Sequence, residues 1–331
     1  MKYHTIYFLA AKFAYNNPNR GLSYEYQTIF LSLADMAHNE KIACYFRDVY
    51  QQSSSSSLLA EVTQISKNGQ NVLIIYCPYT GNIAPSFLRQ FKGIATTGVF
   101  FLDDTWRNDF VNSYIGSCDW FTSSDPNYNH RYRDIFASKP IYFPFGFNEK
   151  EAKKHIRNWQ DRDISLSFIG AHDVFRESVV KIISDAGLQV ECFGEGWPNG
   201  VISNTQFYEV LGSSKVSLNL SNSACWDLRL LIRKPKYLFR NIRTSKTIEQ
   251  FKARHIEIAA LGACQISYYT RGLEKILPIG SHTYIYPSIY EIPAILKSLS
   301  EEEMQRVGDA ARSQVKQFSY QRQFKRLAAI Q

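Results

Sequence analysis

The chain has 331 residues, of which 45% are apolar and 21% charged, a composition typical of folded globular proteins. Domains usually contain about 100–200 residues, so this length favours two domains over one. The formal net charge of +8 favours acidic partners such as phosphorylated small molecules or an anionic membrane surface. Because the charge is spread along the chain without a dense basic tract, we expect no nucleic-acid partner.

The cysteines and histidines predict neither a disulfide framework nor a metal site. The six cysteines are widely spaced without a C-x-x-C pair, and the seven histidines lack metal-ligand spacing. Residues 1–13 are too short and too interrupted for a signal peptide, and no run approaches the length of a membrane span. We therefore expect a cytoplasmic protein without metal, which could still lie peripherally at the inner face of the membrane.

The first half of the chain alternates short apolar runs with segments whose apolar residues recur at helical spacing. Such alternation is typical of a parallel sheet covered by helices on both faces. The predicted strands are residues 3–10, 42–50, 72–77, 99–103, 120–123 and 141–145. The predicted helices are residues 24–38, 57–67, 86–94, 106–117 and 128–137, and the serines at 53–57 are predicted as a surface loop.

The alternation starts again after a polar link at residues 148–162. Residues 301–331 are strongly helical, with a break near Ser319. The sequence thus predicts an α/β protein with two Rossmann-like, doubly wound parallel-sheet domains facing a cleft, residues 1–149 and 150–331, whose last helices could cross back. The predicted elements of the second half are strands at 165–169, 190–193, 216–220, 264–268 and 283–286, and helices at 177–186, 206–213, 251–261 and 289–299.

Ligands of doubly wound sheets bind beyond the carboxyl ends of the strands, where helix N-termini offer free N–H groups to phosphate. The familiar phosphate motifs are missing: no G-x-G-x-x-G follows a predicted strand, and G-x-x-x-x-G-K-[ST] is absent. G-x-S-x-G is absent as well. These absences argue against a dehydrogenase, a P-loop enzyme and an α/β-hydrolase.

Four segments in the second half follow one another in a characteristic order. In that order the chain resembles the CgeB-like (spore maturation protein) branch of nucleotide-sugar glycosyltransferases, which have the two-Rossmann GT-B fold. The resemblance is dense after residue 140, extends through FPFGFN at 143–148, and is thin before residue 70. The four segments are SFIGAHDVFRESVV (167–180), VECFGEGWPNG (190–200), FYEVLGSSKVSLNLSNS (207–223) and ARHIEIAALGACQI (253–266).

The resemblance implies an acceptor-binding N-terminal domain and a C-terminal domain that binds a nucleotide-sugar donor. In many retaining GT-B enzymes two glutamates, separated by seven residues, contact the donor sugar and the ribose, and Glu249 and Glu257 have this spacing. A carboxylate suits a ribose because it accepts two hydroxyl protons, although helix capping would also explain Glu257. The glycines that usually follow the first glutamate are replaced by QFKARH, so retention or inversion stays open.

Other residues of the second half could bind the donor. Gly170 ends a predicted strand, where a missing side chain lets a ligand approach, and the Arg176 guanidinium could neutralise a leaving diphosphate. Lys252 and Arg254 could bind the diphosphate through charge or belong to a solvated helix face. Asn219 ends a predicted strand and could orient donor or acceptor. Trp197 lies where family members form the base pocket, but it could equally belong to the core.

Candidate catalytic groups are Glu249, Asp104 and His172. Asp103 and Asp104 follow a predicted strand, and either could act as general base if the reaction inverts configuration; an N-cap role is the alternative. His130 and His172 lie near predicted strand ends. The loop at residues 19–22 corresponds to one that GT-B enzymes bring toward the acceptor.

Residues 225–246 depart from the family pattern by mixing basic and apolar residues. Such a segment could rest on an anionic membrane and present a lipid-linked acceptor, or it could be a helix with solvated arginines. The predicted function is transfer of a sugar from a nucleoside-diphosphate sugar to a glycan or lipid-linked acceptor, without a cofactor, in synthesis of a bacterial cell-surface polysaccharide. The alternatives are a nucleotide-sugar epimerase of similar fold and a non-catalytic binding protein.

Overall fold

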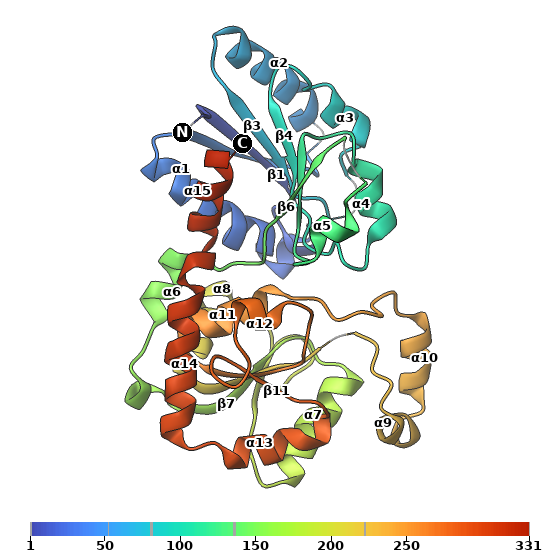
Figure 1. Cartoon of the computed structure of the whole chain (residues 1–331), viewed down its shortest axis with the longest axis vertical. Helices are drawn as coiled ribbons and strands as arrows, with labels where there is room; N and C mark the ends of the chain where they lie inside the picture. Colours follow the sequence, from blue (N-terminus) through green and yellow to red (C-terminus); the bar gives the residue numbers. More distant parts are fainter. Residues whose placement is uncertain (1, 52, 80–81, 135–136, 222, 331) are drawn as a thin grey trace. The chain divides into compact units, whose positions relative to one another are not determined.

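The computed structural model describes residues 2–51, 53–79, 82–134, 137–221 and 223–330 (Figure 1). The chain divides into two compact units. Unit 1 comprises Met1–Glu149 and Gln317–Gln331, and unit 2 comprises Lys150–Lys316. The last helix of the chain therefore belongs to the unit that contains the N-terminus.

Unit 1 is built on a six-stranded sheet in the order β2-β1-β3-β4-β5-β6, in which all neighbouring strands pair in parallel. Parallel neighbours need crossover connections, and helices supply them here. The strands are β1 (Thr5–Ala10), β2 (Ala43–Asp48), β3 (Val72–Tyr76), β4 (Thr96–Val99), β5 (Trp120–Ser123) and β6 (Lys139–Tyr142). The helices of this unit are α1 (Leu31–Asn39), α2 (Ser53–Lys67), α3 (Pro85–Arg89), α4 (Asn108–Tyr114), α5 (Tyr128–Arg131) and α15 (Tyr320–Ile330), with a π-helix, η3 (Glu25–Phe30), before α1.

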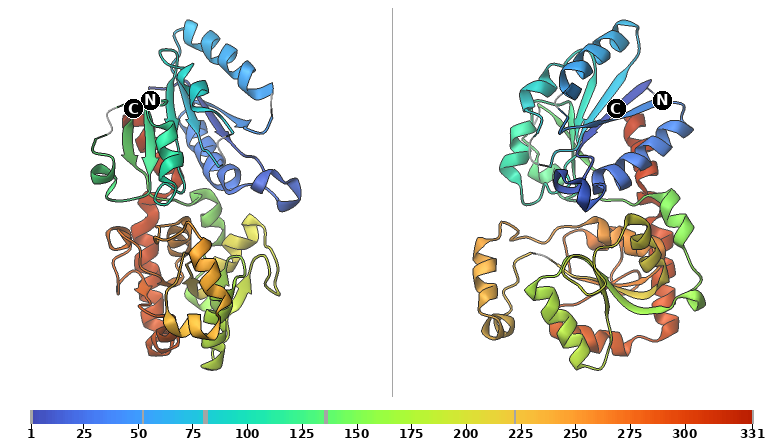
Figure 2. Two further views of the ribbon diagram at one scale, coloured as in Figure 1. Left: turned by 90° about the vertical axis from the view of Figure 1, so that its right-hand side faces the viewer. Right: turned by 180° about the vertical axis from the view of Figure 1, so that it is seen from behind.

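Helices cover both faces of this sheet, as Figures 1 and 2 show. Alternate residues of β1 point to opposite sides, so Ile6 and Phe8 join the core under α1 and α15, while Tyr7 and Leu9 join the core under α2, α3 and α4. Since both faces are buried, the strand is apolar throughout.

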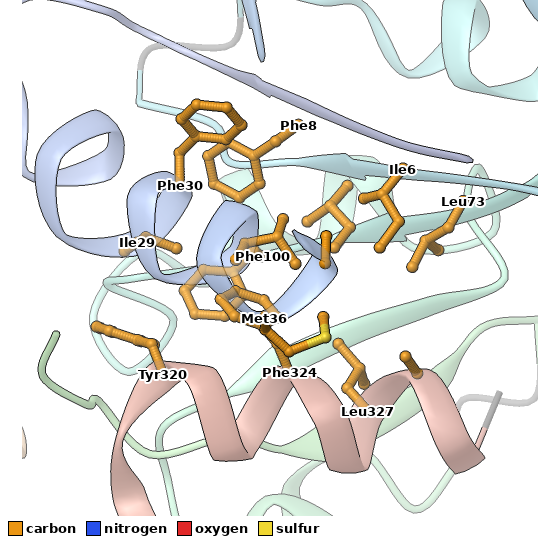
Figure 3. Packing of buried hydrophobic residues seen from close by; sticks show 14 of the residues in the cluster. Ile6, Phe8, Ile29, Phe30, Met36, Leu73, Phe100, Tyr320, Phe324 and Leu327 are labelled. Atoms are coloured by element: carbon orange, nitrogen blue, oxygen red, sulfur yellow. The ribbon is translucent and has the colours of Figure 1, made fainter. Parts of the chain in front are cut away.

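Helix α15 completes the first of these cores. Its buried residues Tyr320, Phe324 and Leu327 point toward the sheet (Figure 3). The Phe324 ring lies 6.0 Å from that of Phe100, and the Tyr24 and Tyr320 hydroxyls are 3.1 Å apart. The last turns of the chain are thus part of the hydrophobic core of unit 1.

Unit 2 is built on a five-stranded parallel sheet in the order β11-β10-β9-β7-β8. Helices α7 and α13 pack into one core with its strands, while α8, α11 and α14 pack against one another and against the sheet. The strands are β7 (Ile164–Ile169), β8 (Glu191–Phe193), β9 (Ser214–Asn219), β10 (Cys264–Ser267) and β11 (Tyr284–Ile285). The helices after the linking helix α6 (Glu149–His155) are α7 (Val174–Asp185), α8 (Asn204–Ser213), α9 (Leu228–Arg233), α10 (Lys236–Arg243), α11 (Ala253–Leu261), α12 (Leu273–Ile276), α13 (Ile292–Ser298) and α14 (Glu301–Val315).

Two predicted elements of unit 1 differ from the structure. The strand predicted at 99–103 is β4 at Thr96–Val99, because Gly98 lacks a side chain where the buried Trp120 ring of β5 packs; a Cβ there would lie 2.0 Å from that ring. The serines predicted as a loop are helical, since α2 begins at Ser53. At β4, contact with the neighbouring strand outweighs the local preference of the residues.

Candidate functional site

The predicted donor-binding residues, together with Glu249 and His172, lie in unit 2, around the carboxyl ends of β7, β8 and β9 and along α7 and α11. The other candidates, Asp103, Asp104, His130 and the loop at residues 19–22, lie in unit 1. Contacts link the elements of this edge. Trp197 Nε1 donates to the Gly170 carbonyl at 2.9 Å, and Ser221 Oγ donates to Glu249 Oε1 at 2.5 Å. The candidate site therefore occupies the sheet edge at which doubly wound folds bind ligands.

Arg176 joins the ends of two strands at the beginning of α7. The helix is capped by Asp173, whose carboxylate accepts from Arg176 N at 2.9 Å. The Arg176 guanidinium donates to the Ala171 carbonyl at 2.7 Å and to the Leu220 carbonyl at 3.4 Å. These bonds hold a positive charge beside the first turn of α7, where the helix dipole also favours an anion.

The loops after β7 and β8 are tied together through their backbones. Gly170 N donates to the Phe193 carbonyl at 2.8 Å, and His172 N donates to the Glu195 carbonyl at 2.7 Å. Gly194 has a φ of 128°, and a Cβ on it would lie 2.4 Å from the Gly170 oxygen. A glycine is thus required at 194 by backbone contact, which the sequence pattern did not reveal.

Trp197 is partly buried between the two loops. Its ring lies edge-on to His172 at 4.8 Å and to Phe168 at 6.1 Å, and its N–H is taken by the Gly170 carbonyl. Trp197 and His172 therefore pack on each other at the edge of the sheet. The base-binding role of Trp197 and the catalytic role of His172 stay predictions.

Glu257 is buried at the N-terminal part of α11, with 4% of its surface exposed. It forms an ion pair with Arg254, whose Nε lies 3.5 Å from Glu257 Oε2. Arg254 also donates to the Ile169 carbonyl and lies over the Phe207 ring at 4.5 Å. Burial raises the pKa of Glu257 to about 7, although Arg254 opposes this rise. The ion pair with Arg254 thus offsets only part of the cost of burying this carboxylate.

The start of α11 is capped by His255, a residue that the sequence reasoning missed. Lys252 N donates to His255 Nδ1 at 3.2 Å, and the ring stacks on Phe251 at 4.8 Å. Burial lowers the pKa of His255 to about 3, so the ring is neutral at pH 7. Since His255 makes this cap, helix capping does not explain the buried carboxyl of Glu257.

Glu249 lies in the loop before α11, beside the end of β9. Its carboxylate accepts from the Ser221 hydroxyl at 2.5 Å, and its backbone carbonyl accepts from Thr270 Oγ1 at 3.3 Å. Burial raises the pKa of Glu249, while Ser221, Ser223 and Lys252 act to lower it. The second carboxylate of the predicted pair is therefore held at the same sheet edge as Glu257.

Asn219 is the last residue of β9, with 5% of its surface exposed. Within the part of the chain that the structure describes, its Nδ2 has no hydrogen-bond partner. A buried amide donor without a partner costs about 1–3 kcal/mol. Asn219 thus offers a donor at the position where a ligand would lie.

Asp104 is in unit 1 and its surroundings do not fit the predicted role of general base. It is 0% exposed, and its carboxylate accepts from the Ser123 hydroxyl, from Ser124 N at 3.2 Å and from Ser124 Oγ at 3.0 Å. The Tyr132 hydroxyl adds a bond at 3.4 Å. A general base must reach its proton, so this enclosed carboxylate ties the end of β5 to the preceding loop.

A second set of polar and aromatic side chains in unit 1 lies in the segments that follow β1 and β3. Glu25 begins the π-helix η3, and burial raises its pKa, with the Asp103 charge adding to the rise. Arg20 of the predicted acceptor loop lies over the Tyr15 ring at 4.8 Å, and Tyr15 packs edge-on against Tyr79 at 5.7 Å. Nothing in the sequence pattern singled out Glu25, because its neighbour Asp103 is distant along the chain.

No helix in the described ranges is long and apolar enough to cross a membrane. Among the same residues, no three His, Cys, Asp or Glu side chains gather as metal ligands would.

Residues 176–329 match the family model described as "Glycosyl transferase-like". None of the curated proteins matches the chain. Solved structures match over nearly the whole chain. At 10–11% identity, this likeness shows the fold alone.

The catalytic domain of starch synthase IV from Arabidopsis thaliana, bound to ADP and acarbose, superposes with a TM-score of 0.61 and 10% identity, covering 99% of both chains. Sucrose-phosphate synthase from Thermosynechococcus elongatus gives a TM-score of 0.60 and 11% identity, covering 99% of this chain and 98% of that one. Alr3699/HepE from Anabaena, in complex with UDP, gives 0.59 and 10%, covering 98% and 99%. These structures confirm the predicted two-sheet GT-B fold, and residues 176–329 are similar to the glycosyl transferase-like family.

Proposed function

We propose that this chain transfers a sugar from a nucleoside-diphosphate sugar to a glycan or lipid-linked acceptor. The observation that carries the proposal is Glu257, a buried carboxyl whose pKa burial raises to about 7. It lies at the sheet edge where a nucleotide would bind, in the segment that matches the glycosyl transferase-like family. The HepE and starch synthase IV structures contain UDP and ADP, respectively, which makes a nucleoside diphosphate a suitable first ligand to test.

In this proposal Glu257 binds the ribose of the donor. Two vicinal hydroxyls would donate to its carboxylate oxygens. Binding would then favour the ionised carboxylate and lower its pKa again. Arg254 would act as a positioning residue, because it holds Glu257 at 3.5 Å while bonding to the Ile169 carbonyl.

The diphosphate is proposed to lie between the N-termini of α7 and α11, without a metal ion. Arg176, held beside α7, and Lys252, at the N-cap of α11, would face its oxygens together with the free N–H groups of both helices. As the bond between sugar and phosphate breaks, negative charge grows on the leaving diphosphate. Fixed positive charge stabilises that transition state more than the ground state.

Glu249, rather than the enclosed Asp104, is the carboxylate that we place beside the donor sugar. Its position next to Ser221 at the end of β9 supports this assignment, as does the unpartnered amide of Asn219 on the same strand. A retaining outcome fits the seven-residue separation of Glu249 and Glu257. The anomeric configuration of the product, measured by NMR, distinguishes retention from inversion.

Thermal unfolding with a panel of UDP, GDP, dTDP, ADP and CDP tests the donor site. A nucleotide at a hundred times its Kd should stabilise the protein by about 2.7 kcal/mol. We expect one nucleotide to raise the Tm of the wild type and to lose that effect in Glu257→Gln, while Glu274→Gln, an exposed glutamate of unit 2, behaves as the wild type.

Equal shifts in all three proteins, or no shift with any nucleotide at millimolar concentration, would contradict the proposal. With the matching nucleotide sugar and a glycan acceptor, release of free nucleotide indicates transfer. Conversion of the nucleotide sugar to an isomer, without any release, would instead indicate an epimerase.

A further inference from the structure

Helices α9 and α10 form a hairpin that leaves the donor-site edge of unit 2 and returns to it. The hairpin follows β9 and precedes Glu249 and α11, and Figures 1 and 2 show it standing at the margin of unit 2. Its base is closed by Ala224 N, which donates to the Lys246 carbonyl at 2.9 Å, and by Ser223 Oγ, which donates to the Ile248 carbonyl at 3.4 Å. The segment is therefore a folded projection of the donor-binding unit.

One side of the hairpin is anchored to unit 2. Leu230 and Tyr237 are buried, and the Tyr237 ring stacks on Phe175 of α7 at 6.1 Å. Lys234 pairs with Glu177 of α7 at 3.5 Å, and Arg229 donates to Ser288 Oγ at 2.9 Å. The orientation of the hairpin on unit 2 is thus fixed by packing and by polar contacts.

The opposite side is apolar and open to solvent. Its five large side chains are between 58% and 78% exposed, although single exposed apolar residues are the usual pattern on a protein surface. They also recur at helical spacing, four apart in α9 and three apart in α10, so each helix presents its pair on one side. We call this set the outer apolar surface; it comprises Trp226, Leu228, Ile232, Phe239 and Ile242. A concentration of this kind is typical of a surface that binds a partner.

The charge of the hairpin identifies the kind of partner. Residues 225–246 contain seven lysines and arginines and one acidic residue, Asp227. Asp227 is itself paired with Arg229 at 3.1 Å. Large apolar side chains framed by basic ones are typical of helices that lie in the interface of an anionic bilayer. Basic charge attracts anionic surfaces of several kinds. An anionic lipid bilayer is one into which apolar side chains can also insert.

We propose that the outer apolar surface inserts into the headgroup region of an anionic membrane, to which the net positive charge of residues 225–246 attracts the protein. The protein would then hold its donor-site edge next to the bilayer, because the hairpin begins and ends there. This inference goes beyond the proposed function and does not depend on it, since docking needs neither nucleotide nor turnover.

Cosedimentation of the full chain with vesicles tests the proposal. One vesicle type consists of phosphatidylcholine alone, and the other contains about 40% phosphatidylglycerol as the anionic lipid. We expect binding to the anionic vesicles to exceed binding to the neutral ones on the order of tenfold at low salt, and to fall as salt rises. Trp226 provides a second signal: its fluorescence should shift to the blue with anionic vesicles, and Trp226→Phe should abolish that shift.

The variant Ile232→Ser/Phe239→Ser/Ile242→Ser removes three side chains of the outer apolar surface. Vesicle binding should fall by more than roughly tenfold, because each buried apolar side chain contributes separately, while the Tm stays within a degree or two. The control Val201→Ser/Ile279→Ser changes exposed apolar residues elsewhere in unit 2 and should leave binding intact.

Three results would overturn the proposal. One is no binding of the wild type to anionic vesicles at low salt. Another is equal binding by the triple variant and the wild type. The third is a wild type that is dimeric without lipid and becomes monomeric in the triple variant, which would show that a second copy covers this surface.

Discussion

Each unit buries a carboxyl group near a sheet edge, and burial raises the pKa of both groups, but their partners differ. Asp104 of unit 1 accepts hydrogen bonds from Ser123, Ser124 and Tyr132. Glu257 of unit 2 has Arg254 as its ion-pair partner, and burial raises its pKa to about 7. A buried carboxylate that is enclosed by the fold's own hydrogen-bond donors stabilises the fold, whereas one held by an ion pair can also accept hydrogen bonds from a ligand.

The largest effect is expected from Asp104→Ala. This change leaves the buried Ser123 and Ser124 hydroxyls and a backbone N–H without their acceptor, which should lower the free energy of unfolding by about 4 kcal/mol. Urea unfolding followed by circular dichroism measures the loss. Asp134→Ala, at an exposed aspartate of the same unit, should cost less than about 0.5 kcal/mol. Equal effects of the two substitutions would show that the hydrogen bonds of Asp104 do not stabilise the fold.

Glu257 should give the opposite result, with a dependence on pH. Its pKa is 4.5 in the unfolded chain and about 7 in the folded protein, so the unfolded chain loses the proton first as pH rises. The free energy of unfolding should therefore fall by about 3 kcal/mol between roughly pH 4.5 and pH 7 because of this group.

Glu257→Gln removes that contribution. Relative to the wild type, the variant should be more stable at pH 8 than at pH 4.5, although it no longer binds the nucleotide. Urea midpoints at the two pH values measure this difference, with Glu274→Gln as control. Parallel pH profiles of wild type and Glu257→Gln would show that the fold satisfies Glu257 after all.

The same comparison can be made between two buried amides, Asn219 and Asn241. Substitution of Asn219 should have the smallest effect on the free energy of unfolding. Asn241 is also buried, but its side chain donates to the Cys225 carbonyl and accepts from Cys225 N at 3.4 Å. Asn241→Leu should thus lower the free energy of unfolding by about 1–2 kcal/mol, whereas Asn219→Leu should change it by less than about 1 kcal/mol.

Nucleotide-sugar binding should respond in the reverse order, falling about tenfold in Asn219→Leu, the equivalent of one lost hydrogen bond. Isothermal titration calorimetry measures this change. Tight binding by Asn219→Leu, together with a large loss of stability, would show that Asn219 serves the fold rather than the ligand.

The residues of the candidate site could be chosen from the sequence because most follow predicted strands. In a parallel sheet the carboxyl ends of strands share one edge, so the sequence predicts that Gly170 and Asn219 lie at the same edge. The same rule selects Asp104, whose carboxylate is enclosed by hydroxyl groups. The rule locates the carboxyl edge of the sheet, but it does not tell which side chains at that edge already have hydrogen-bond partners within the protein.

The sequence alone determined the two-sheet α/β organisation, because strands buried on both faces must be apolar throughout and helices with one buried face must be periodic. Tertiary structure decided the rest. Helix α15 packs with Phe100 in the core of unit 1, Gly194 lies against the Gly170 oxygen, and His255 caps α11 in place of Glu257. Each depends on burial or on contacts between distant residues, and a local pattern contains neither quantity.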